Sequence, residues 1–87
     1  MTPAQRERPV VIAMFMRVSP QTGKPVVTEA WPADQLPGVW ELRMRLNLDM
    51  RGILVRFPPG TTPEQVFQAS DLLSDQERAA LYEKAGR

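Results

Sequence analysis

Apolar and polar residues alternate without interruption over residues 40–48, and the apolar Val39 precedes them. The even positions carry Trp, Leu, Met, Leu and Leu, and the odd positions after Val39 carry Glu, Arg, Arg and Asn. Side chains of a β-strand point alternately to its two faces, so a period of two is typical of a strand with one face in water. The pattern predicts a strand over residues 39–48 whose apolar face is turned toward a core.

Three other segments predict the rest of a sheet. Residues 10–18 are apolar on both parities and rich in β-branched side chains, which is typical of a central strand covered on both faces. A turn-forming segment separates them from residues 26–31, and the two segments together predict a hairpin. A second hairpin is predicted between residues 39–48 and 53–57, with its turn at residues 49–52.

The C-terminal third predicts two helices. Thr62 is placed as an N-cap, with Pro63 in the first helical position and Gln65 three residues after the cap. A second capping box runs from Ser74 to Glu77 and precedes a helical pattern. Gly86 is a candidate C-terminal cap for that helix.

These segments predict an α+β domain. The expected architecture is a four-stranded antiparallel sheet made of two hairpins, followed by two C-terminal helices packed on one face. With 87 residues the chain has room for one domain, which we assign to residues 9–87. Residues 1–8 are polar and aperiodic, so a flexible N-terminal arm is expected there. The pattern leaves open the order of the strands and which of them lie at the edges.

The chain has no cysteine and no histidine. It therefore lacks the commonest general base, the commonest ligands of transition metals and the thiol nucleophile. We expect a protein that is not an enzyme, with no catalytic residues, no cofactor and no metal site. A domain this small has a thin core and here no disulfide to reinforce it, so homodimerisation is a natural remedy.

The longest apolar run spans residues 10–16, far short of the roughly 18–20 residues that a membrane-spanning helix needs. No export signal is recognised at the N-terminus. The expected location is the cytoplasm, with no membrane contact.

Candidate binding residues come from the polar side of the predicted third strand and its neighbours. Arginines spaced along one strand can meet carboxylates of a partner protein or successive phosphates, although charged residues also simply keep an uncovered sheet face in water. Phe15, with Val11 and Ala13, would form an exposed apolar strip if it lay on the face opposite the helices. The candidate partner-binding residues are Glu41, Arg43, Arg45, Arg56, Arg17 and Phe15.

The sequence predicts a small, non-enzymatic protein that binds another protein, or a copy of itself, through its sheet face or edge. An accessory, regulatory or inhibitory role fits this size. The alternative is nucleic-acid binding by the same arginines. The net charge of only +1 and the absence of aromatic residues among the polar positions of residues 39–48 favour the protein-binding interpretation.

Overall fold

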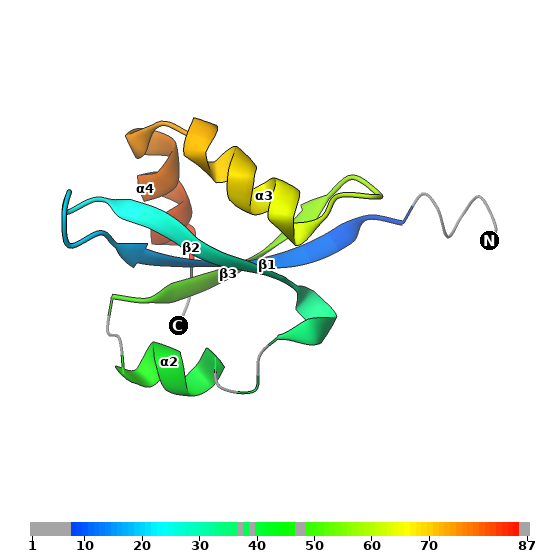
Figure 1. The fold of residues 1–87 in the computed structure, drawn as a ribbon, viewed down its shortest axis with the longest axis horizontal. Coiled ribbons are helices and arrows are strands. Elements are labelled where there is room, and N and C mark those ends of the chain that lie inside the picture. Colours follow the sequence, from blue (N-terminus) through cyan, green and yellow to red (C-terminus); the bar gives the residue numbers. More distant parts are fainter. Residues whose placement is uncertain (1–7, 37, 39, 47–48, 86–87) are drawn as a thin grey trace.

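A computed structural model describes residues 8–36, 38, 40–46 and 49–85. Figure 1 shows a sheet with helices on both of its faces. The elements, in chain order, are β1 (Val10–Val18), β2 (Pro25–Pro32), the short 3₁₀ helix η1 (Ala33–Gln35), α2 (Trp40–Leu46), β3 (Arg51–Phe57), α3 (Pro63–Ala69), the 3₁₀ helix η2 (Ser70–Leu72) and α4 (Asp75–Lys84).

The described strands form one antiparallel sheet in the order β2-β1-β3. The predicted hairpin of β1 and β2 is confirmed, and so is the central position of β1. Phe15 lies opposite Glu29 on β2 and opposite Gly52 on β3. The register between β1 and β2 shifts after Phe15, because Met16 pairs with Val27 and leaves Thr28 as an extra residue.

The prediction of four strands in two hairpins is wrong, because residues 40–46 form helix α2 and the sheet has three strands. The seven residues of α2 are Trp-Glu-Leu-Arg-Met-Arg-Leu. None is β-branched, and Glu, Leu, Arg and Met are all strong helix formers. The alternation of apolar and polar residues has the period of a strand, whereas the helix propensities of these residues favour the helix that is observed. Val39, Asn47 and Leu48, which belonged to the predicted strand, lie outside the described residues.

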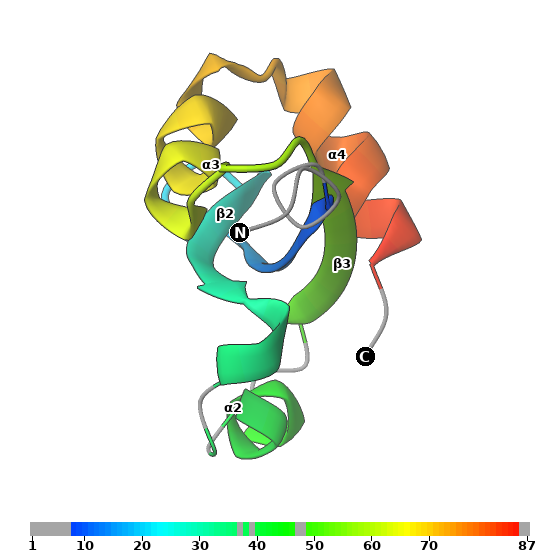
Figure 2. The same cartoon turned by 90° about the vertical axis from the view of Figure 1, so that its right-hand side faces the viewer.

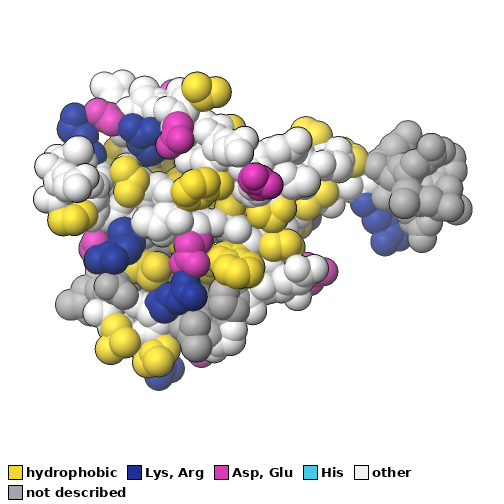
Figure 3. All heavy atoms as spheres, in the orientation of Figure 1, with side chains coloured by type: hydrophobic (Ala, Val, Ile, Leu, Met, Phe, Trp, Pro, Cys, Tyr) yellow, Lys and Arg dark blue, Asp and Glu magenta, His cyan; other side chains and the backbone are white. Residues whose placement is uncertain are grey.

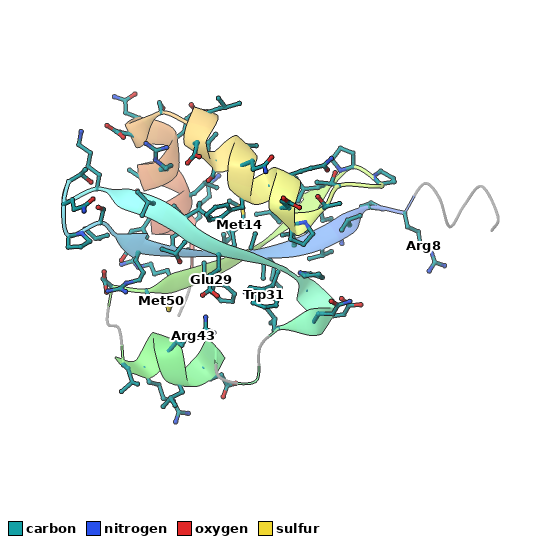
Figure 4. All side chains as sticks on the ribbon, viewed as in Figure 1. Arg8, Met14, Glu29, Trp31, Arg43 and Met50 are labelled. Carbon is teal, nitrogen blue, oxygen red and sulfur yellow. The ribbon has the colours of Figure 1, made fainter. Side chains whose placement is uncertain are left out.

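The sheet separates two clusters of buried side chains (Figures 1 and 2). On one face, Ile12, Met14 and Met16 of β1 pack with Val66 of α3. On the other face, Ala13, Phe15 and Met50 are buried with Trp31 and Leu36 beside them. Figure 4 shows Met14 on the α3 side and Met50 on the α2 side. The apolar residues of both parities in β1 are explained by these two covers.

The two C-terminal helices begin where the sequence predicts. The Thr62 hydroxyl accepts from the Gln65 N–H at 3.1 Å, and the Ser74 hydroxyl accepts from the Glu77 N–H at 3.1 Å. Both caps are complete capping boxes. Two hydrogen bonds with Ser74 hold the pKa of the Glu77 carboxyl below its usual range. The larger effect comes from the Ser74 backbone and the smaller one from its side chain. Gly86, the predicted C-terminal cap, lies outside the described residues.

The chain is thus a small α+β domain. In the part of the chain that the structure describes, no helix combines the length and the apolar character needed to cross a bilayer. The predicted arm of residues 1–8 falls outside the described residues except for Arg8, which is exposed.

Candidate interaction edge of the sheet

The outer edge of β3 is the first feature of the candidate site. Among the described strands β3 pairs with β1 alone, so its other side has no strand beside it. A strand at the edge of a sheet presents backbone N–H and C=O groups that can pair with another chain. Leu54, in the middle of β3, is 63% exposed, and Arg56 is also exposed. Within the described residues, the edge thus has no neighbouring strand and is apolar at its centre.

Side chains of β3 also line a pocket on the helix side of the sheet. Val55 and Phe57 form one wall, and Met14 of β1 contributes to the pocket as well. The volume is about 220 Å³. The remaining walls come from α3, α4 and the segment between them, through Val66, Ala69, Ser70, Leu73 and Leu81.

The pocket lining is apolar. Ser70 is the one polar side chain among the described residues that line it, and the Ser70 hydroxyl donates to the Phe67 carbonyl at 2.6 Å. Since this hydroxyl is already engaged, the lining offers mainly van der Waals contact and burial from water. An aliphatic or aromatic group suits it better than a polar ligand.

The other edge of the sheet, β2, is obstructed in several ways. Pro25 and Pro32 stand at its two ends and have no backbone N–H to donate. Thr28 forms the bulge, and the Thr28 hydroxyl donates to the Phe15 carbonyl at 3.2 Å. Bulges and prolines are common devices by which proteins keep an edge from pairing.

Helix α3 stands beside the β2 edge. A shallow hollow there is lined by β2 residues and by Pro63, Glu64 and Phe67 of α3. In Figure 2 α3 lies over β2 and α4 stands beside β3. The start of α4 is also bound to the turn before β2, through Asp75 and Lys24. Figure 3 shows the β2 side of the molecule, where basic and acidic side chains sit next to one another among apolar ones. A strand added at β2 would meet α3. At β3 the neighbouring helix is α4, whose Tyr82 contacts Arg51 at the start of the strand.

The arginines that were predicted to share one sheet face lie on three different elements of the structure. Arg43 lies on α2, and its guanidinium donates to the Glu29 carboxylate at 2.5 Å (Figure 4). The Trp31 indole N–H donates to the other oxygen of the same carboxylate at 3.3 Å. Arg17 lies 3.8 Å from the Asp49 carboxylate. Two of the four candidate arginines therefore have carboxylate partners within the chain.

The remaining predicted residues fall in different places. Glu41 and Arg45 are exposed on α2, and Arg56 is exposed on β3. Phe15 is on the face opposite α3 and α4, but it is 4% exposed, because the α2 side of the sheet is covered. The expected exposed apolar strip is a buried cluster. Of the candidate residues, Arg56 alone lies on the open edge.

The chain leading into β3 is anchored to α4. The Tyr82 hydroxyl donates to the Asp49 carbonyl, and the Arg51 guanidinium donates to the Tyr82 carbonyl at 3.0 Å. The guanidinium carbon of Arg51 also lies 4.3 Å from the centre of the Tyr82 ring. These contacts fix the start of the edge strand against α4.

Sequence reasoning missed Leu54, Val55 and Phe57 as site residues. Their signal was present in the sequence, since residues 51–57 form a short strand without an internal proline. The strand was expected to be paired with residues 39–48. Because those residues form a helix instead, one side of β3 is left without a neighbour.

No family model, curated protein sequence or solved structure matches this chain.

Proposed function

We propose that this chain is a small protein-binding domain that receives an extended segment of a partner protein along the outer edge of β3. The backbone groups of β3 can hydrogen-bond to an added strand of almost any sequence. The observation that carries the proposal is that an open strand edge, an exposed Leu54 and an apolar pocket all involve one seven-residue strand. The role is binding rather than catalysis, as an accessory or regulatory domain in the cytoplasm.

The pocket provides sequence selectivity. Alternate side chains of an added strand project to the helix side of the sheet, where Val55 and Phe57 line the pocket. An apolar cavity of about 150 Å³ holds a benzene molecule, so a pocket of about 220 Å³ suits a Leu, Met or Phe side chain. The preferred partner segment therefore carries a large apolar residue on this side.

The opposite face of the added strand meets different groups. Leu54 and Arg56 project to the α2 side and are exposed there. An apolar residue beside Leu54 and an acidic residue beside Arg56 would complete the match. The partner is thus an extended segment with a large apolar side chain on one face and an apolar and an acidic side chain on the other.

The nucleic-acid alternative has less support from the geometry. Phosphate binding needs free guanidinium groups along one surface. Arg43 and Arg17 each face a carboxylate within the chain, and Arg45 and Arg56 lie on different elements.

The test is selection of peptides from a displayed library of random seven- to twelve-residue sequences against the purified protein. We expect enriched peptides with apolar residues at alternate positions, and we expect their binding to protect the backbone amides of β3 from hydrogen exchange. Leu54→Lys should weaken binding tenfold or more, because it places a charge at the centre of the contact. Since Leu54 is 63% exposed, its replacement should change the free energy of unfolding by less than about 0.5 kcal/mol.

Two further variants make the test specific. Leu72→Lys replaces an 88% exposed leucine away from β3 and should leave peptide binding unchanged. Ala69→Phe narrows the pocket from the α3 side and should weaken only those peptides that carry a large apolar anchor. Failure to enrich any peptide, or protection confined to α2, would overturn the proposal.

A further inference from the structure

We infer that a second copy of this chain can occupy the same edge, with two β3 strands running antiparallel about a two-fold axis at Leu54. The inference rests on the proposed function, because it uses the same open strand. A two-fold contact requires a surface that is complementary to itself. The residues of β3 meet this requirement in one register.

The register follows from the strand's length and parity. With Leu54 on the axis, Leu54 lies opposite the partner's Leu54, Ile53 lies opposite the partner's Val55, and all seven residues of Arg51–Phe57 are paired. Residues directly opposite in an antiparallel pair share a face, so the helix sides of both copies lie on one face of the six-stranded sheet. Moving the axis to Ile53 or Val55 leaves the strand's ends opposite residues outside it.

The charges of β3 are arranged to allow this pairing. Arg56 lies opposite the partner's Gly52, which has no side chain to crowd it. Arg51 lies opposite the partner's Phe57, and its guanidinium is already held against Tyr82 of its own chain. Like charges opposite one another destabilise a strand pair, and no arginine faces an arginine in this register.

Leu54 is the residue that would lose the most solvent exposure in the pair. It is 63% exposed in the single chain, and it projects from the centre of a strand in which only Arg56 is exposed besides it. In the pair, two leucines lie side by side, with Cα atoms about 4.5–5.5 Å apart. Proteins often place charged residues on edge strands to prevent pairing with another chain. β3 instead has an apolar residue at the position of the proposed axis.

The absence of native cysteine allows a direct test of the register. A single cysteine at position 54 would lie within the Cα distance of about 4.4–6.8 Å that a disulfide spans. A cysteine at position 56 points to the same face. The cysteines of the two chains would, however, be four residues apart along the strand pair, or about 14 Å. Leu54→Cys should therefore form a disulfide-linked dimer under mild oxidation, and Arg56→Cys should not.

The result is read on a non-reducing gel, with Leu72→Cys as the control for random collision of exposed thiols. Sedimentation of the unaltered protein should give twice the chain mass of 9.9 kDa at high concentration, and Leu54→Lys should give the single mass. Equal crosslinking of all three cysteine variants, or none at position 54, would overturn self-pairing. Peptides that still protect β3 in that case leave the proposed function standing, whereas crosslinking without peptide binding contradicts the proposed function alone.

Discussion

The two edge strands of this sheet differ in how far the chain itself closes them. β2 has a proline at each end, a bulge at Thr28 and helix α3 beside it. β3 has no proline, pairs in register with β1 throughout and presents Leu54 to solvent. Proteins avoid unwanted edge contacts with devices of the kind seen at β2. β3 has neither a proline nor a bulge within its described residues, and for this reason we propose the contact at this edge.

The largest expected effect on stability comes from removing the side chain of Phe15, which lies on the α2 side of the sheet. Phe15 is buried with Met50, and Trp31 and Leu36 pack against them. Phe15→Ala should lower the free energy of unfolding by about 3–5 kcal/mol, because a buried aromatic ring is lost and a cavity remains. Urea denaturation measures the change.

The matched control for this variant is Phe67→Ala on α3. Phe67 is 41% exposed, so its loss should cost much less. If Phe15→Ala costs under about 1 kcal/mol, the α2 side of the sheet is not a second core, and β2 is less closed than the geometry indicates.

A smaller effect is expected at the start of α4, on the other face of the sheet. Ser74→Ala removes the oxygen that accepts from the Glu77 N–H. Loss of an N-cap typically costs about 1 kcal/mol. Thermal or urea denaturation should show this loss, and Ser74→Asp, which can cap in the same way, should restore most of it. Equal stability of the Ala and Asp variants would contradict the role of the cap.

The ion pair between α2 and β2 should contribute less to the free energy of unfolding than the Ser74 cap does. Arg43 and Glu29 form an ion pair whose side chains are 37% and 28% exposed. Pairs that reach solvent typically contribute about 0.2–1 kcal/mol, and salt screens them. A double-mutant cycle with Arg43→Met and Glu29→Gln should give a coupling energy in this range that falls as salt is added. A coupling of zero would show that the pair does not hold α2 against β2.

Local signals in the sequence predicted several elements of the fold, although not its number of strands. The hairpin of β1 and β2, the strand β3 and the two capped helices depend on residue types and spacings that lie within a few residues of one another. The N-caps at Thr62 and Ser74 are the clearest cases, since hydroxyl and partner are three residues apart. Such features depend little on the rest of the molecule.

The segment of residues 40–46 shows where pattern alone fails. Its alternation fits a strand, because a helix places alternate residues on different faces. In α2 the alternate leucines Leu42 and Leu46 are indeed exposed, so the apolar positions do not form one buried face. Helix propensity favoured the correct answer. A helix this short is not stable alone, so its contacts with the sheet also decide its structure, and these were absent from the sequence pattern.

The candidate site was predicted only in part for the same reason. Arg43 was assigned to an outer face with Arg45 and Arg56, and the helix instead directs it to Glu29. Leu54 could not be recognised as an edge residue, since an edge is defined by which segments fail to pair. Strand order is a property of the whole chain.

The smallest effect should be a pH dependence at α4, whose N-terminus is tied to the turn before β2. Hydrogen bonds from Lys24, and then from Arg78, hold the pKa of the Asp75 carboxyl below its ordinary value of 3.8. A carboxyl whose pKa is lower in the folded state contributes stability above the unfolded pKa and loses it as the pH falls through the folded pKa. Asp75→Asn should therefore lower the melting temperature slightly at neutral pH, and the difference should vanish in acid below pH 3.8. Because the group is exposed, added salt should shrink the difference at neutral pH. Thermal melts from neutral pH into acid test this expectation, and a difference that persists unchanged in acid would assign the effect of Asp75 to something other than its charge.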